Sequence, residues 1–201
     1  MGIVLSLAVF FSAVVIHEFA HAFVAYRRGD TTAQRMGRLT LNPLAHIDPF
    51  GTIFLPLMLI AMRSPVLFGW AKPVPINFAS LKNPKKDMIW VGIAGPLANL
   101  LFAAAASILL KLGAKDFGIA GALLQYSIIV NSVLAVFNLI PIPPLDGSRV
   151  LMGLLPAPLA MQMARLEPYG FIILFALLYM GLFEKFVWPV AAVVIHFITT
   201  L

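Results

Sequence analysis

Long apolar runs separated by short polar stretches dominate the pattern of this chain, and three of them are long enough to cross a membrane as helices. A helix needs roughly 20 mostly apolar residues to span a bilayer. The last two runs are shorter, so they either cross with little tilt or pair as a hairpin. The pattern predicts an all-α polytopic membrane protein with about five transmembrane helices, at residues 3–26, 88–110, 117–140, 169–183 and 186–201.

A further apolar stretch, residues 50–77, is interrupted and does not have the pattern of a single transmembrane helix. Its uninterrupted part, residues 50–62, is 13 residues long. A run of roughly 10–14 residues is more typical of a re-entrant or interfacial segment. Pro73 and Pro75 then favour extended backbone. We expect a re-entrant, partly extended membrane segment here, although the pattern leaves a full crossing open.

Composition supports the membrane class and excludes others. Hydrophobic residues make up 61% of the 201 residues and charged residues only 11%, whereas a soluble domain carries roughly 25% charged residues. The chain has no cysteine, so disulfides and cysteine ligands or nucleophiles are excluded. Its net charge of +6 is spread over loops, so we expect the lipid bilayer and no nucleic acid as a partner.

The distribution of basic residues predicts the orientation of the chain in the membrane. No lysine or arginine precedes residues 27–38, which carry four arginines, and three lysines follow at 82, 85 and 86. The positive-inside rule then places the N-terminus outside and both polar stretches in the cytosol. We expect a multi-pass protein of a prokaryotic inner membrane, retained by its first span, because a basic n-region and a cleavage site are missing from the N-terminus.

The first span contains the motif His17-Glu18-Phe19-Ala20-His21. Two histidines four residues apart on a helix lie about 40° apart around the axis and about 6 Å apart along it, so both can reach one ion. In zinc proteases this pattern supplies two ligands, and the Glu is the general base. The alternative is a pair of core histidines. Inserting a charged side chain at bilayer depth costs about 3 kcal/mol, so a cluster of such residues is expected only where it has a function.

A catalytic zinc requires a third protein ligand, and Asp146 is the best candidate. It follows three prolines in residues 141–147, and broken backbone at membrane depth is tolerated only where it is buried or lines a cavity. If residues 50–70 do not cross the membrane, Asp146 lies on the cytosolic side at the depth of His17 and His21. If they do cross, it lies on the far side, and so do the lysines that follow.

Other polar residues are weaker candidates for a catalytic or binding role. Asn138, before the broken segment, either hydrogen-bonds an extended substrate or makes an interhelical bond. We expect Gly95 to pack between helices, His46 to be a loop or interfacial residue, and His196 to be a hydrogen-bonded packing residue.

Three motifs together resemble the site-2 protease family of intramembrane zinc metalloproteases. They are the motif at residues 17–21, Gly-Pro-Leu-Ala-Asn at 95–99, and Asn-Leu-Ile-Pro-Ile-Pro-Pro-Leu-Asp-Gly at 138–147. The resemblance covers residues 1–150 and implies a metalloprotease core there, with residues 151–201 as a C-terminal transmembrane hairpin. It implies that His17, His21 and Asp146 bind Zn²⁺, that Glu18 is the base and that Asn138 helps to hold the substrate.

The expected function is therefore hydrolysis of peptide bonds in the transmembrane segments of protein substrates. We expect a short form without a peptide-binding or nucleotide-sensing domain. Two alternatives remain, a metal transporter or channel and a catalytically silent scaffold that binds membrane segments. A transport site has no need for Glu18, and the inverted repeats of many transporters are missing. The oligomeric state is left open.

Overall fold

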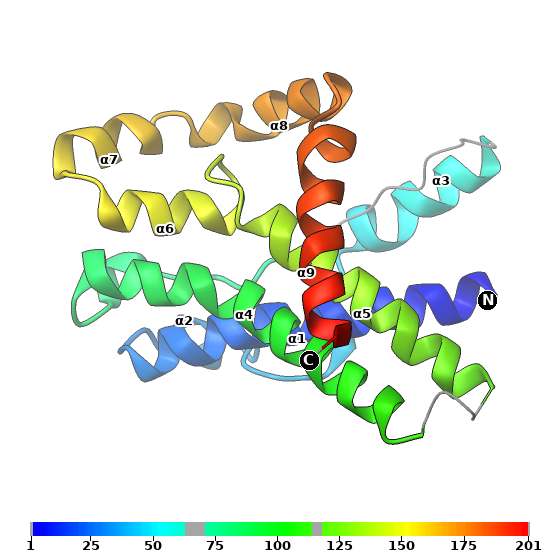
Figure 1. Ribbon diagram of the computed structural model, residues 1–201. Coiled ribbons are helices and arrows are strands. Elements are labelled where there is room, and N and C mark those ends of the chain that lie inside the picture. Colours follow the sequence, from blue (N-terminus) through cyan, green and yellow to red (C-terminus); the bar gives the residue numbers. More distant parts are fainter. Residues whose placement is uncertain (1, 63–70, 114–117, 201) are drawn as a thin grey trace.

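Every regular element that the computed structural model describes is a helix (Figure 1). The structure describes residues 2–62, 71–113 and 118–200. In these ranges five helical stretches are long and apolar enough to cross a membrane. They are Leu5–Arg27, Pro84–Lys111, Ile119–Asn138, Ala157–Tyr179 and Phe183–Thr200. The predicted all-α membrane fold is therefore confirmed.

Three long helices form the centre of the molecule: α1 (Ile3–Arg27), α4 (Pro84–Lys111) and α5 (Ile119–Asn138). α4 begins at the end of the molecule where α1 finishes, and α5 returns antiparallel to α4 (Figure 1). Buried alanines at 103 and 106 let α4 approach its neighbours closely. They pack against Ile128 of α5 and Ile198 of α9 (Trp188–Thr200), which lies across both helices (Figure 1).

The segment between α1 and α4 leaves and returns at the same end of the bundle. The Lys82 N–H donates to the Arg28 carbonyl at 2.9 Å, which closes the segment at its base. Residues 71–77 form no helix, and Val74 is buried against Ala22 of α1. This path is that of a re-entrant loop, although residues 63–70 lie outside the described part. Its short helices are α2 (Thr32–Arg35), η1 (Pro43–His46), η2 (Pro49–Phe54), α3 (Leu55–Ala61) and η3 (Phe78–Ser80).

After α5 the backbone unwinds over residues 139–145 and then forms more helix than the sequence predicted. Residues 146–164 lie between the predicted spans at 117–140 and 169–183, and they contain two helices. The fourth apolar stretch consequently starts at Ala157, earlier than the predicted run at 169–183. The helices here are α6 (Asp146–Leu154), α7 (Ala157–Ala164), η5 (Glu167–Tyr169), α8 (Gly170–Tyr179) and η6 (Phe183–Val187).

Candidate metal centre

Three side chains bring one potential metal-ligand atom each to a single point between α1, α4 and α6. Nε2 of His17 lies 3.0 Å from Nε2 of His21, and Oδ2 of Asp146 lies 3.0 and 3.1 Å from these two nitrogens. Tetrahedral zinc with bonds of about 2.0–2.1 Å separates its ligand atoms by about 3.3 Å. The triangle therefore fits a zinc ion with a small outward adjustment, and a fourth position is left for water. Among the residues that the structure describes, this is the one cluster of potential metal ligands that we find.

Each candidate ligand comes from a position that its local sequence explains. His17 and His21 lie one helical turn apart on the face of α1 that is turned towards α4, and both are buried. Asp146 is the first residue of α6, where the partial positive charge of a helix N-terminus favours a carboxylate. An ionised carboxylate is the form that binds a metal.

The second ring nitrogen of each histidine is held by an acceptor on α4. Nδ1 of His21 donates to the Val91 carbonyl at 2.7 Å. Nδ1 of His17 donates to Oδ1 of Asn99 at 2.7 Å. The orientation of the Asn99 amide is fixed because its Nδ2 donates to the Ala13 carbonyl. Both histidines therefore carry their proton on Nδ1, which leaves the lone pair on Nε2 free for the metal.

The support of His17 continues into α5 through a chain of two buried amides. Asn99 Nδ2 also donates to Oδ1 of Asn131 at 2.7 Å, and Asn131 Nδ2 donates to the Ser127 carbonyl. Both asparagines are fully buried. The sequence pointed to Asn99 only as the last residue of the 95–99 motif and gave no indication of this role.

Two glycines allow the backbone to approach the site. A Cβ built on Gly95 would lie 2.3 Å from Nε2 of His21 and 2.6 Å from Nε2 of His17. One built on Gly147, next to Asp146, would lie 2.2 Å from the Leu139 carbonyl oxygen. Gly95 is thus a packing residue, as expected, but its partners are the two metal-binding candidates themselves.

Glu18 lies beside this cluster and is attached to the extended segment at 71–77. Its Oε2 accepts a hydrogen bond from the Val74 N–H at 2.7 Å. The side chain is half-buried, so it is neither sealed in the core nor free in solvent. This bond brings the extended segment to the depth of Glu18, about 14 Å along α1 from Arg27.

The remaining candidates do not belong to this cluster of ligand atoms. Nδ2 of Asn138 donates to the Leu134 carbonyl in its own helix, at the end of α5. His46 is buried, and its Nε2 bonds the Thr40 carbonyl in the loop that follows α2. His196 is exposed on α9, so the expectation that it is a packing residue is wrong.

Comparisons with known proteins agree with this geometry. The model of peptidase family M50 matches residues 5–117 and 113–181. The chain belongs to peptidase family M50. It is 42% identical over 183 residues to "Putative zinc metalloprotease YwhC" of Bacillus subtilis, covering 87% of this chain and 80% of that protein. Identity is 33% with "Putative zinc metalloprotease Rip2" of Mycolicibacterium smegmatis, covering 87% and 66%.

A more distant relative, "Zinc metalloprotease MJ0392" of Methanocaldococcus jannaschii, is 29% identical over 72% of this chain and 32% of that protein. No solved structure matches. Membership of the M50 family confirms the expected enzyme class, a zinc-dependent metalloendopeptidase of the site-2 protease type. The described part of the chain contains five helical stretches long and apolar enough to span a membrane.

Proposed function

We propose that this M50 peptidase hydrolyses peptide bonds within or next to the transmembrane segments of membrane proteins, at a zinc ion held by His17, His21 and Asp146. The observation that carries the proposal is the convergence of three ligand atoms within 3.0–3.1 Å of one another, beside Glu18 and inside a bundle of apolar helices.

The bound metal supplies a Lewis acid and a water molecule of lowered pKa. Side chains and backbone groups of this protein transfer the proton and orient the histidines. Glu18 takes a proton from that water on a carboxylate oxygen and later passes it to the leaving amine. Asn99 and the Val91 carbonyl keep the Nε2 lone pairs of His17 and His21 aimed at the metal.

The substrate must be unwound where it is cut, because a transmembrane helix protects its amides with its own hydrogen bonds. In the extended segment 71–77 the N–H groups of Lys72, Val74 and Asn77 already bond within the protein. A second extended strand can pair only with the remaining backbone groups of this segment, which are mostly carbonyls. The attachment of the segment to Glu18 through Val74 supports this role, because a paired substrate would then lie next to the proposed base. Asn138, at the point where α5 ends, is the proposed side-chain contact to the substrate backbone.

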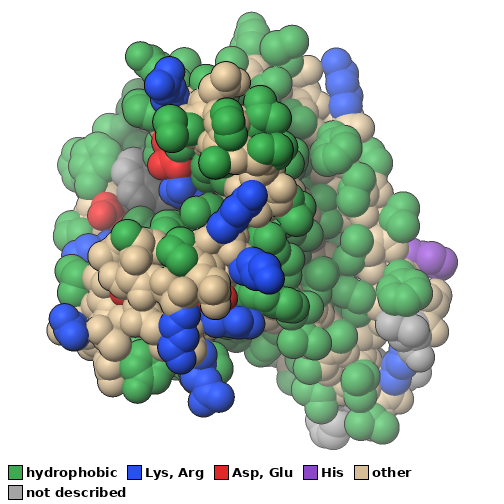
Figure 2. Space-filling view, turned by 90° about the vertical axis from the view of Figure 1, so that its left-hand side faces the viewer, with side chains coloured by type: hydrophobic (Ala, Val, Ile, Leu, Met, Phe, Trp, Pro, Cys, Tyr) green, Lys and Arg blue, Asp and Glu red, His purple; other side chains and the backbone are tan. Residues whose placement is uncertain are grey.

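We further propose that residues 1–150 form the protease core, that 151–201 pack against it as a hairpin, and that the active site opens to the cytosol of a prokaryotic cell. Figure 2 supports this orientation, since lysine and arginine side chains gather on the end of the molecule where α1 finishes and α4 begins. Basic residues favour the cytosolic side of an inner membrane.

The experiment compares purified wild type with Glu18→Gln and, as a matched control, with Glu184→Gln on the exposed surface. Zinc per chain and cleavage of a single-span model substrate are both measured. We expect one zinc in all three proteins, and cleavage reduced about 100-fold or more only in Glu18→Gln. Zinc without cleavage in wild type, across varied substrates, would instead favour the transporter or the silent scaffold.

A further inference from the structure

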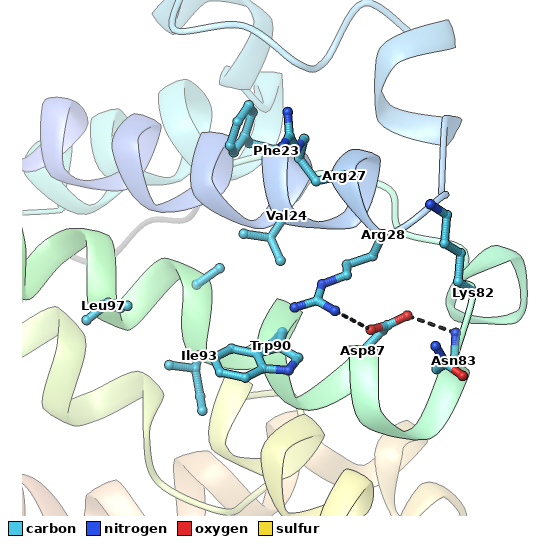
Figure 3. Close-up of a pocket in the computed structure, with 11 residues that line it drawn as sticks. Phe23, Val24, Arg27, Arg28, Lys82, Asn83, Asp87, Trp90, Ile93 and Leu97 are labelled. Carbon is cyan, nitrogen blue, oxygen red and sulfur yellow. Dashed lines mark hydrogen bonds and ion pairs between the residues drawn. The ribbon is translucent and has the colours of Figure 1, made fainter.

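A groove of about 500 Å³ lies on the surface between α1 and α4, outside the metal centre. Figure 3 shows Arg28 reaching from the end of α1 towards Asp87 and Trp90 on α4, with Ile93 and Leu97 further along that helix. One end of the groove is basic and the other is apolar. Its full lining is Phe23, Val24, Arg27, Arg28, Lys82, Asn83, Asp87, Trp90, Ile93, Ala94 and Leu97.

The basic end carries more positive charge than its own walls neutralise. The lining contains three basic side chains, Arg27, Arg28 and Lys82, and a single acidic one, Asp87. Asp87 is buried and already occupied, because it accepts from Arg28 Nη1 at 3.1 Å and from the Asn83 N–H at 2.8 Å. Arg28 still has 41% of its side chain exposed. A negatively charged group therefore finds available donors here.

The apolar end extends in the direction of the membrane interior. Leu97 lies 13 residues after Pro84, which is about 20 Å along α4. Phe23, Trp90 and Leu97 each leave 45–54% of their surface exposed, which suits contact with lipid. Trp90, with the Arg28 guanidinium 5.5 Å from its ring, lies about 9 Å from the start of α4, where interfacial tryptophans are common.

We infer that this groove binds an anionic phospholipid, with the phosphate near Arg27, Arg28 and Lys82 and one acyl chain along Phe23, Ile93 and Leu97. Basic pockets between transmembrane helices bind anionic lipid headgroups in this way. A substrate helix fits less well, because a helix 10–12 Å wide fills roughly 500 Å³ with a single turn. The inference does not depend on the proposed hydrolysis, since it concerns a surface outside the metal centre.

The test is lipid retention measured by native mass spectrometry, with phosphatidylglycerol and phosphatidylcholine of identical chains at equal concentration. The variant is Arg27→Gln with Lys82→Gln, which leaves the Arg28–Asp87 pair in place. The control, Arg35→Gln with Arg165→Gln, removes the same charge from exposed positions outside the groove. Zinc content checks that each protein is folded.

We expect wild type and the control to retain phosphatidylglycerol preferentially. The groove variant should bind it roughly 25-fold more weakly, about fivefold per basic residue removed. Millimolar inorganic phosphate should not displace it, because the acyl chain contributes to binding. Equal retention of the two lipids by wild type, equal losses in variant and control, or displacement by phosphate would overturn the inference.

A second measurement does not depend on the charge variants. Phosphatidylglycerol with brominated acyl chains should quench the fluorescence of Trp90, measured as the difference between wild type and Trp90→Phe. Quenching that is unchanged by Trp90→Phe would mean that no acyl chain lies in the groove.

Discussion

At the scale of single residues, the Asn99 amide has the most specific role after the ligand candidates. Its carbonyl accepts from His17 Nδ1 while its Nδ2 donates to Ala13 and Asn131, so one buried side chain links three helices to one imidazole. Outer partners of this kind fix the tautomer of a metal ligand and raise its basicity.

Replacing Asn99 by Ala should weaken zinc binding by about 10–100-fold, the usual cost of losing such a partner. The measurement is competitive zinc titration against a chelator with the purified protein. Ser107→Ala is the control, because Ser107 is also buried on α4 but bonds the Ile198 carbonyl away from the metal centre. Equal zinc affinity in wild type and Asn99→Ala would remove Asn99 from the site.

Gly95→Ala should also lose zinc, although alanine is the better helix former. The added methyl would lie 2.3 Å from Nε2 of His21, so the imidazole must leave the position in which it meets Asp146. Gly92→Ala, about one turn earlier, is the graded comparison, because its added methyl would lie 3.1 Å from the Asp146 carbonyl oxygen and would not touch a ligand atom. The ratio of zinc to protein should fall strongly in the first variant and little in the second. The reverse order would contradict the packing seen here.

The candidate ligands could be predicted from the sequence, whereas the residues that support them could not, and the reason is physical. His17 and His21 are four residues apart, so helix geometry alone brings them together. Asp146 was chosen for its place on the broken segment, and the count of membrane crossings agrees with it if residues 50–70 do not cross. The Val91 carbonyl belongs to the backbone, so no side chain marks it in the sequence. Whether Asn99 or Asn131 bonds His17 depends on how α4 is rotated against α1. That rotation depends on packing throughout the bundle.

At the scale of elements, the extended segment 71–77 is held at several points along its backbone. Val74 N–H bonds Glu18, Lys72 N–H donates to the His46 carbonyl, and Asn77 N–H donates to Asp30. The Arg38 guanidinium also donates to the Lys72 carbonyl at 2.7 Å. The prolines predicted extended backbone here, but these long-range bonds have no local signal in the sequence.

Val74→Pro removes the N–H that donates to Glu18 and should lower turnover about tenfold or more while zinc content stays near wild type. The loss of one hydrogen bond to a charged group corresponds to roughly 1.5–3 kcal/mol. Val74→Ala keeps the N–H and is the matched control. Cleavage of a model substrate and zinc content are measured on the same preparations.

Lys72→Pro, which removes the bond to His46, should show the same separation of turnover from zinc content. If zinc and turnover fell together in both proline variants, the segment would serve only to hold the fold. The proposed role in substrate pairing would then fail, while the proposal of the metal centre itself would still stand.

At the scale of the whole molecule, the Arg28–Lys82 bond and the Arg28–Asp87 pair tie the two ends of the segment between α1 and α4 together. This closure supports the crossing count that brings Asp146 to the depth of His17. The C-terminal part was harder to foresee, because α6 and α7 lie between polar and proline residues that interrupt any long apolar run.

Single cysteines can test this topology without background, since the chain contains no cysteine. Three exposed positions are suitable for substitution by cysteine: Arg35 after α1, Lys86 at the start of α4 and Lys111 at the end of α4. In intact cells a membrane-impermeant maleimide should label only the variant at 111. The variants at 35 and 86 should react together after the membrane is opened, because the segment between them returns to the side from which it started.

Labelling of 35 and 86 from opposite sides would show that residues 50–70 cross the membrane. Asp146 would then lie across the bilayer from His17 and His21, and the metal centre could not form.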